Sequence, residues 1–200
     1  NGEQMERLAA HGNGNYAFID DEREAERVVR RDLLSTMVVV AENAKVQVEF
    51  DPVRVVRWRL LGYENRGLED DEFRDDAVDT GDVGAGHDVT ALFELELRPG
   101  ATATPEHLAT VAIRYTEPGG GTTREQVESI LGSEVRATFD QASEATRLAA
   151  AVAEFAEILR QSRFSEGRRF ADVRAIVQPL VGDDADRAEL LELVERAEAL

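Results

Sequence analysis

A long alternation of apolar and polar residues runs through positions 84–97, GAGHDVTALFELEL, and limits the folds open to this chain more than any other stretch. The polar face carries Glu94 and Glu96, and the other face collects Val89, Ala91, Phe93, Leu95 and Leu97. A two-residue period is typical of a β-strand with one buried and one solvated face. The stretch therefore predicts a strand of about ten residues, long for a strand, at the centre of a sheet.

Three further segments share this two-residue period. They lie at 37–50, 56–60 and 109–115, and turn residues such as Asp51 and Pro52 separate them. Short strands divided by turns are typical of antiparallel sandwiches. We therefore predict an antiparallel β-sandwich over residues 36–118.

A different period begins after the glycine run Pro118–Gly121, which predicts a linker. Apolar residues then follow the i, i+3, i+4 spacing of a helix from Ala145 to Leu159, and two further helical patterns lie near 170–177 and 184–197. We predict a wholly helical region over 119–200. The fold class is thus α+β, with the sandwich before the helices.

The first 35 residues have a pattern of their own. A helix is predicted to end at the glycines near His11, followed by a short strand at Asn15–Ile19 and a helix at Glu22–Leu33. We interpret residues 1–35 as the C-terminal remnant of an α/β domain and the whole chain as a piece of a longer protein. An open strand edge and an apolar helix stripe recruit partners, so we expect the remnant to pack on the sandwich or to form a homodimer.

Composition excludes several functions. The net charge of −18 and the pI of about 4.5 oppose binding to nucleic acid or to anionic lipid. Cysteine is absent, so a disulfide framework, a thiol nucleophile and a thiolate metal site are excluded. No apolar run approaches the roughly 20 residues of a membrane span, although the parent protein could still be membrane-associated.

Catalytic motifs are not found either. The chain has one lysine, Lys45, with no glycine before it, which excludes a phosphate-binding loop. The Gly-x-Ser-x-Gly nucleophile motif is missing, and the three histidines lie in different segments. We expect a non-enzymatic protein. A hydrolase is the less favoured alternative, because no nucleophile–base pair or metal cluster can be recognised.

Two regions are candidate sites. The acidic segment 69–82 carries eight carboxylates, which makes a calcium-dependent structural module an alternative, but the EF-hand spacing is missing and we predict no tight divalent site. The second candidate is a set of partner or loop-structuring contacts at Tyr63, Glu64, Asn65, Arg66 and His87.

Four stretches of the chain resemble one protein family. LAAHGNGNYAFID (8–20) resembles the last strand and helix entry of bacterial von Willebrand factor A domains. VQVEFDPVRVVRWRLLGYENR (46–66), GDVGAGHDVTALFELEL (81–97) and FDQASEATRLAAAVAEFAEIL (139–159) resemble the region after that domain in YfbK-type proteins.

The resemblance implies a von Willebrand factor A remnant, a sandwich and a helical end, and it implies no reaction. It places Mg²⁺ in an upstream domain only, because the Asp-x-Ser-x-Ser motif of that domain does not occur in this chain. We therefore expect an interaction module that supports the metal-binding domain and docks a partner protein, in a parent from the cell envelope or the extracellular space.

Overall fold

The computed structural model describes residues 4–5, 8–9, 16–19, 21–29, 38–62, 72–76, 78, 80–102 and 105–200. These residues form two compact units that interleave along the chain. The first unit takes its residues from 1–55, 66–89 and 98–132, and the second from 56–65, 90–97 and 133–200. The three domains predicted from the sequence stay a prediction.

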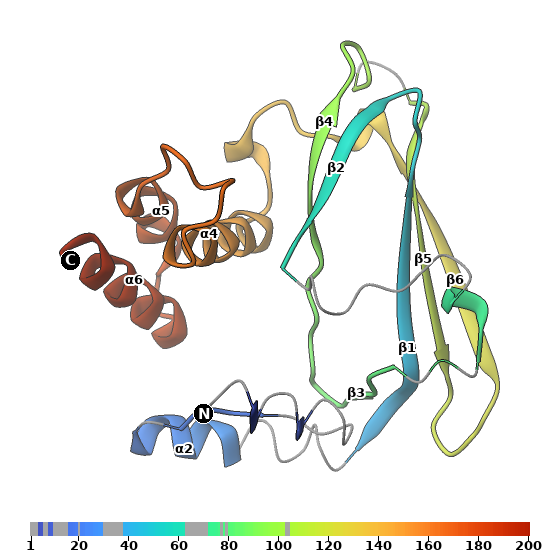
Figure 1. Cartoon of the computed structure of the whole chain (residues 1–200), viewed down its shortest axis with the longest axis horizontal. Coiled ribbons are helices and arrows are strands. Elements are labelled where there is room, and N and C mark those ends of the chain that lie inside the picture. Colours follow the sequence, from blue (N-terminus) through green and yellow to red (C-terminus); the bar gives the residue numbers. More distant parts are fainter. Residues whose placement is uncertain are drawn as a thin grey trace. The chain divides into compact units, whose positions relative to one another are not determined.

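A four-stranded antiparallel sheet forms the first unit (Figure 1). Its spatial order is β3 (Val83–Gly84), β1 (Val39–Phe50), β5 (His107–Thr116) and β6 (Thr123–Leu131). Apolar residues face each other across the central pair β1–β5, at Val46↔Ile113, Val48↔Val111 and Phe50↔Ala109. Such cross-strand pairs stabilise a sheet and set its register. The buried apolar side chains of the unit are Val55, Phe73, Ala101, Leu108, Ala109 and Ala112.

The prediction of one long central strand at 84–97 is wrong. Gly84 belongs to the two-residue strand β3 beside β1, whereas β4 spans only Leu92–Leu97 and pairs with β2 (Val55–Leu61). Gly86 has a φ of 75°, which turns the chain out of the ladder with β1. The alternation itself is confirmed within β4, where Phe93, Leu95 and Leu97 are half-buried and the two glutamates are exposed. The central strands are β1 and β5.

The prediction that the chain is helical throughout after the glycine run is also wrong, because β6 lies there. Gly119 and Gly120 have φ values of 78° and 72°, and the N–H of Glu117 donates to the carbonyl of Thr122 at 3.1 Å. The glycines therefore make a hairpin turn between β5 and β6 instead of a linker. The side chains of β6 are exposed on both faces, so the strand shows no apolar alternation in the sequence.

Three helices and the two-stranded sheet β2–β4 form the second unit (Figure 1). The helices are α4 (Glu144–Leu159), α5 (Phe170–Val177) and α6 (Ala185–Glu198), with short 3-10 turns at η3 (Gly132–Glu134), η4 (Phe139–Gln141) and η5 (Gln178–Leu180). Ser143 and Asp184 cap α4 and α6 by accepting hydrogen bonds from backbone N–H groups of the first turn. The helical core contains Ala151, Val173, Val177 and Val194, all fully buried.

The N-terminal prediction is met only in part. The helix α2 spans Glu22–Arg27, inside the predicted range, whereas residues 16–19 belong to no helix or strand. A strand is defined by its ladder, so an alternating segment without a paired neighbour is not assigned as one. Residues 4–5 and 8–9 are also helical, whereas residues 1–3, 6–7, 10–15, 20 and 30–35 of the predicted remnant lie outside the described ones.

The predicted α+β class with antiparallel sheets and C-terminal helices is confirmed. The sandwich and the α/β remnant stay proposals. None of the helices in the described part of the chain is long and apolar enough to cross a membrane.

Candidate interaction site

The grouping of the five residues selected from the sequence stays a prediction, because only one of them is described. Tyr63, Glu64, Asn65 and Arg66 lie outside the described residues. His87 is exposed in the turn after β3, and its backbone N–H donates to the carbonyl of Gly84 at 3.1 Å. This is a backbone contact, so both the loop-structuring and the partner role of the His87 side chain stay predictions.

Part of the acidic segment is fastened to β1 by a β-bulge. The register between β1 and β5 shifts between Glu42 and Lys45, and Asn43 inside the bulge has a φ of 51°. Its side-chain oxygen accepts the N–H of Thr80 at 3.2 Å, and its own N–H donates to Oδ1 of Asp82 at 3.1 Å. The bulge therefore makes the backbone N–H and the side chain of Asn43 available for hydrogen bonds with residues 80 and 82 of the acidic segment.

The single lysine of the chain holds the 3-10 turn η2 (Glu72–Arg74). Lys45 is only 3% exposed, and its Nζ donates to the carbonyl oxygens of Glu72 at 3.2 Å and Asp75 at 2.5 Å. The ammonium group of this β1 residue thus donates hydrogen bonds to backbone carbonyl oxygens of the acidic segment. A buried ammonium requires such acceptors, because an uncompensated buried charge is costly.

Four charged side chains continue this attachment across β5 and β6. Arg114 pairs with Asp76 at 2.8 Å and with Glu125 at 3.4 Å, and Arg74 reaches Glu125 at 2.9 Å. The hydrogen bond from Arg74 and the charges of both arginines hold the pKa of the Glu125 carboxyl below its usual range. Within the described residues, no three acidic or histidine side chains lie close enough to hold a metal ion. The calcium alternative also involves Glu69, Asp70, Asp71 and Asp79, which lie outside the described residues.

The β2–β4 pair has one charged face. Arg57 pairs with Glu96 through a 2.6 Å hydrogen bond from Nε, and Arg59 pairs with Glu94 through a 3.0 Å hydrogen bond from Nε. Opposite charges across neighbouring strands stabilise this pairing. The alternation of arginine in β2 and glutamate in β4 therefore defines one polar face.

Helix α4 is attached to this charged face through Glu157. The NH1 group of Arg59 donates to Glu157 Oε2 at 3.2 Å, and Arg160 binds the other carboxylate oxygen. The guanidinium of Arg59 also lies 3.9 Å from the centre of the Phe164 ring. Burial by itself raises the pKa of Glu157, but hydrogen bonds from Ser162, Arg59 and Arg160 outweigh it, and the pKa lies below the usual value.

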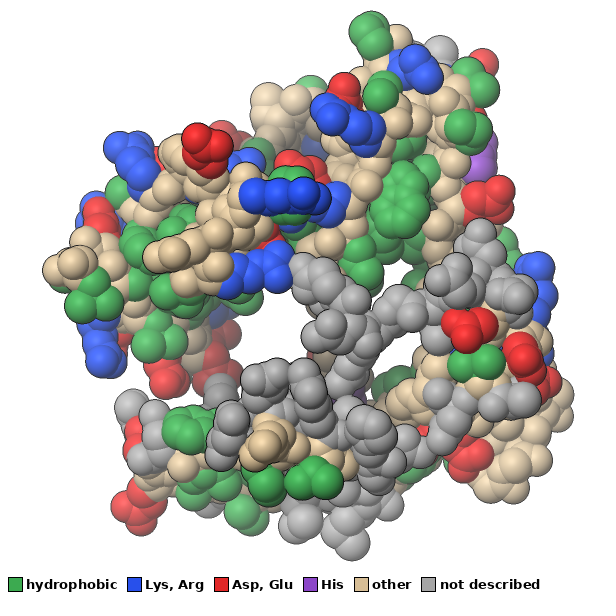
Figure 2. Space-filling model, viewed as in Figure 1, with side chains coloured by type: hydrophobic (Ala, Val, Ile, Leu, Met, Phe, Trp, Pro, Cys, Tyr) green, Lys and Arg blue, Asp and Glu red, His purple; other side chains and the backbone are tan. Residues whose placement is uncertain are grey.

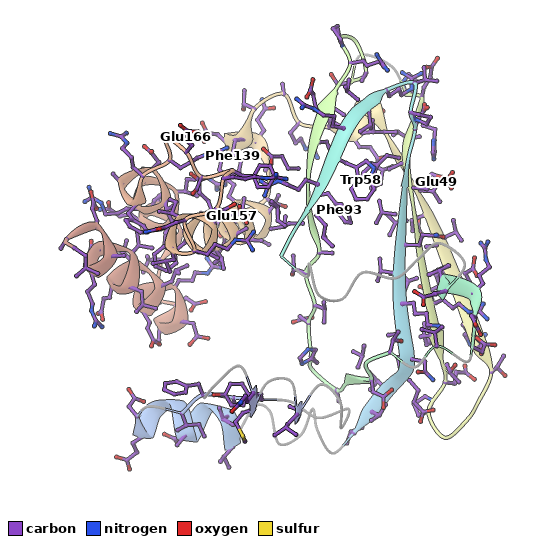
Figure 3. The ribbon with its side chains drawn as sticks, viewed as in Figure 1. Glu49, Trp58, Phe93, Phe139, Glu157 and Glu166 are labelled. Carbon is purple, nitrogen blue, oxygen red and sulfur yellow. The ribbon has the colours of Figure 1, made fainter. Side chains whose placement is uncertain are left out.

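The opposite face of the β2–β4 pair is apolar and partly open. Val56 and Trp58 are 44% and 56% exposed, and the Trp58 ring meets Phe93 of β4 edge to face, with centroids 6.0 Å apart. Trp58 and Phe93 lie side by side, whereas Glu157 lies on the other side of the strands (Figure 3). Figure 2 shows hydrophobic side chains at the surface beside β2. We call Val56, Trp58 and Phe93 the aromatic face.

The aromatic face was not recognised as a site from the sequence. Phe93 is half-buried and Trp58 is exposed. The signal was present in the charges, because Arg57 and Arg59 alternate with Val56 and Trp58. This pattern assigns one face of β2 to ion pairs and the other to apolar contact.

Comparison with known proteins identifies one family. The family model described as "Uncharacterized protein YfbK, C-terminal" matches residues 35–200. The curated "Uncharacterized protein YfbK" of Escherichia coli (strain K12) is 34% identical over 98% of this chain. The aligned part is 36% of that relative, so the chain spans about a third of its length. No solved structure matches.

Proposed function

This chain belongs to the family of YfbK C-terminal regions, and from that premise we propose that it is a non-enzymatic structural and protein-interaction module. In this proposal it supports a von Willebrand factor A domain in its parent protein, and the aromatic face of β2–β4 is the docking surface. The parent acts in the cell envelope or the extracellular space. The resemblance of residues 8–20 to the end of a von Willebrand factor A domain supports the presence of that domain upstream.

The observation that carries the proposal is the division of faces on the β2–β4 pair. The helices of the same unit attach to the charged face through Arg59 and Glu157, and on the opposite face Val56 and Trp58 are 44% and 56% exposed. Tryptophan is among the side chains that contribute most to protein interfaces. An exposed tryptophan held in place by an edge-to-face phenylalanine loses little conformational entropy on binding.

We propose that the upstream part of the parent occupies this face. About two thirds of the curated relative lies outside the aligned part, which supports the proposal of a large partner within one polypeptide. A partner held in the same chain has a high effective concentration, so a modest apolar patch is sufficient for docking. In this proposal Mg²⁺ is bound by that upstream part and not by this chain, which lacks the Asp-x-Ser-x-Ser motif.

The charged groups support a structural role over a catalytic one. The pKa values of Glu125, Glu157 and Asp172 all lie below their usual ranges, and each of these carboxylates is paired with arginine. A general acid near neutral pH requires the opposite shift. A hydrolase and a calcium-dependent module are the alternatives. A calcium titration tests the calcium-dependent module.

The docking proposal is tested by titrating the upstream part of the parent, as a separate polypeptide, into this chain by calorimetry, with and without Mg²⁺. Trp58→Ala should weaken binding about tenfold or more, because interface tryptophans are frequent hot spots. Phe139→Ala is the matched control, since Phe139 is an aromatic residue in η4 that is 45% exposed. Equal affinities of the Trp58→Ala variant and the unsubstituted chain for the upstream part would contradict the proposal.

The predicted sandwich is a second proposal for the same face. In a sandwich, the aromatic face would be covered by apolar residues of β1 and β5 such as Val46 and Ile113, which are 56% and 41% exposed. Trp58 is the only tryptophan, so its fluorescence reports on this face alone. Acrylamide should quench an open Trp58 strongly. Weak quenching together with a loss of about 3 kcal/mol or more on Trp58→Ala would favour the sandwich.

A further inference from the structure

The geometry points to β6 as a self-association edge: we propose that two copies of this chain pair antiparallel through β6, with Gln126 opposite its own counterpart. This inference concerns the first unit and is independent of the aromatic face. It also differs from the homodimer predicted from residues 1–35.

Strand β6 is a long edge. The sheet order ends at β6, and the strand at the other end, β3, has only two residues. β6 has nine residues and no proline, and no described strand pairs with its outer side. Such an edge is a template for another strand.

The hairpin register determines which backbone groups point outward. The N–H of Glu117 donates to the carbonyl of Thr122, and the pairs that follow are Tyr115↔Arg124 and Ile113↔Gln126. Hydrogen-bonded and non-hydrogen-bonded pairs alternate in an antiparallel ladder. The even-numbered residues of β6 therefore bond to β5, and the odd-numbered residues present their N–H and C=O groups outward, at Thr123, Glu125, Val127 and Ser129.

Two copies can pair only through these odd-numbered residues, which restricts the register. With Gln126 opposite Gln126 of the second copy, Glu125 bonds to Val127 and Thr123 bonds to Ser129 of the other strand. The non-bonded pairs, whose side chains are closest, then place Arg124 opposite Glu128 twice. A shift that places Glu125 opposite Glu125 is opposed by like charge.

The side chains at these positions are available for the pairing. Arg124 uses its Nε for Glu117 at 2.6 Å, and its guanidinium has four further N–H donors. Glu128 is exposed and has no ion-pair partner among the described residues. Val127 is 55% exposed at the centre of the edge. The strand is therefore self-complementary in charge, as a two-fold interface requires.

The test is a charge swap measured by sedimentation equilibrium of the whole chain over a range of concentrations. Arg124→Glu and Glu128→Arg each place like charges opposite one another, and each should raise the dimer dissociation constant about tenfold or more. The double variant restores both pairs and should return the constant to within about threefold of the original. Arg136→Glu, the same change of charge at an exposed residue outside β6, should have no comparable effect.

A backbone variant tests the edge separately. Val127→Pro removes an outward N–H and should abolish the dimer while circular dichroism stays unchanged, because that N–H makes no bond to β5. A chain that is monomeric at about 1 mM, a concentration that detects even weak pairing, would overturn the inference. A dimer that is insensitive to the charge swaps and to the proline would also overturn it.

Discussion

At the scale of single residues, Lys45 is a charged side chain that is almost completely buried, at 3% exposure. Its buried ammonium binds two carbonyl oxygens of the acidic segment, at Glu72 and Asp75. Lys45→Met keeps the chain length but leaves these oxygens without their donor, and hydrogen bonds to charged groups contribute about 1.5–3 kcal/mol each. We expect the free energy of unfolding, measured in urea, to fall by about 2 kcal/mol or more. Glu49→Met, an exposed change on the same face of β1, is the control, and an equal loss in both variants would contradict this role.

At the scale of elements, Glu157 joins α4 to β2, and its pKa makes that attachment sensitive to acid. A depressed folded-state pKa means that the carboxylate adds stability above the unfolded-state value of about 4.3, and that this contribution is lost as pH falls through the lower folded-state value. Glu157→Gln should therefore reduce the pH dependence of urea unfolding below about pH 5. It should also cost about 1–3 kcal/mol at neutral pH. Glu166→Gln, at an exposed glutamate near the same helices, is the control (Figure 3). An unchanged pH profile in Glu157→Gln would contradict the assignment.

At the scale of the whole molecule, the net charge of −18 opposes the compact state through self-repulsion. Salt screens this repulsion, so the melting temperature should rise by about 3 °C or more between low salt and about 0.5 M NaCl. CaCl₂ and MgCl₂ at matched ionic strength should give equal shifts, because Lys45 and Arg114 bind the described part of the acidic segment and no metal-binding cluster lies among the described residues. A submicromolar calcium isotherm, lost in Asp75→Asn combined with Asp76→Asn, would instead support the calcium-dependent module.

The sequence by itself determined the local elements and the family. Helical spacing at 145–159 and the two-residue period at 93–97 and 109–115 matched the observed elements, because periodicity directly reflects which side chains share a face. It missed β6, whose side chains are exposed on both faces, since a strand without a buried face has no apolar period. The candidate contacts at 63–66 came from residue types alone, and the described residues do not include them.

Only the tertiary structure decided which strands are partners. The stretch 84–97 reads as one strand, yet its ends pair with β1 and β2 in different sheets. Which segments pack together depends on hydrogen bonds between residues far apart in the chain. Arg59 of β2 and Glu157 of α4, for example, are 98 positions apart. The same is true of Lys45, whose acceptors lie about 30 positions downstream. A local pattern shows that a face is apolar, but what covers that face is set by the packing of distant segments.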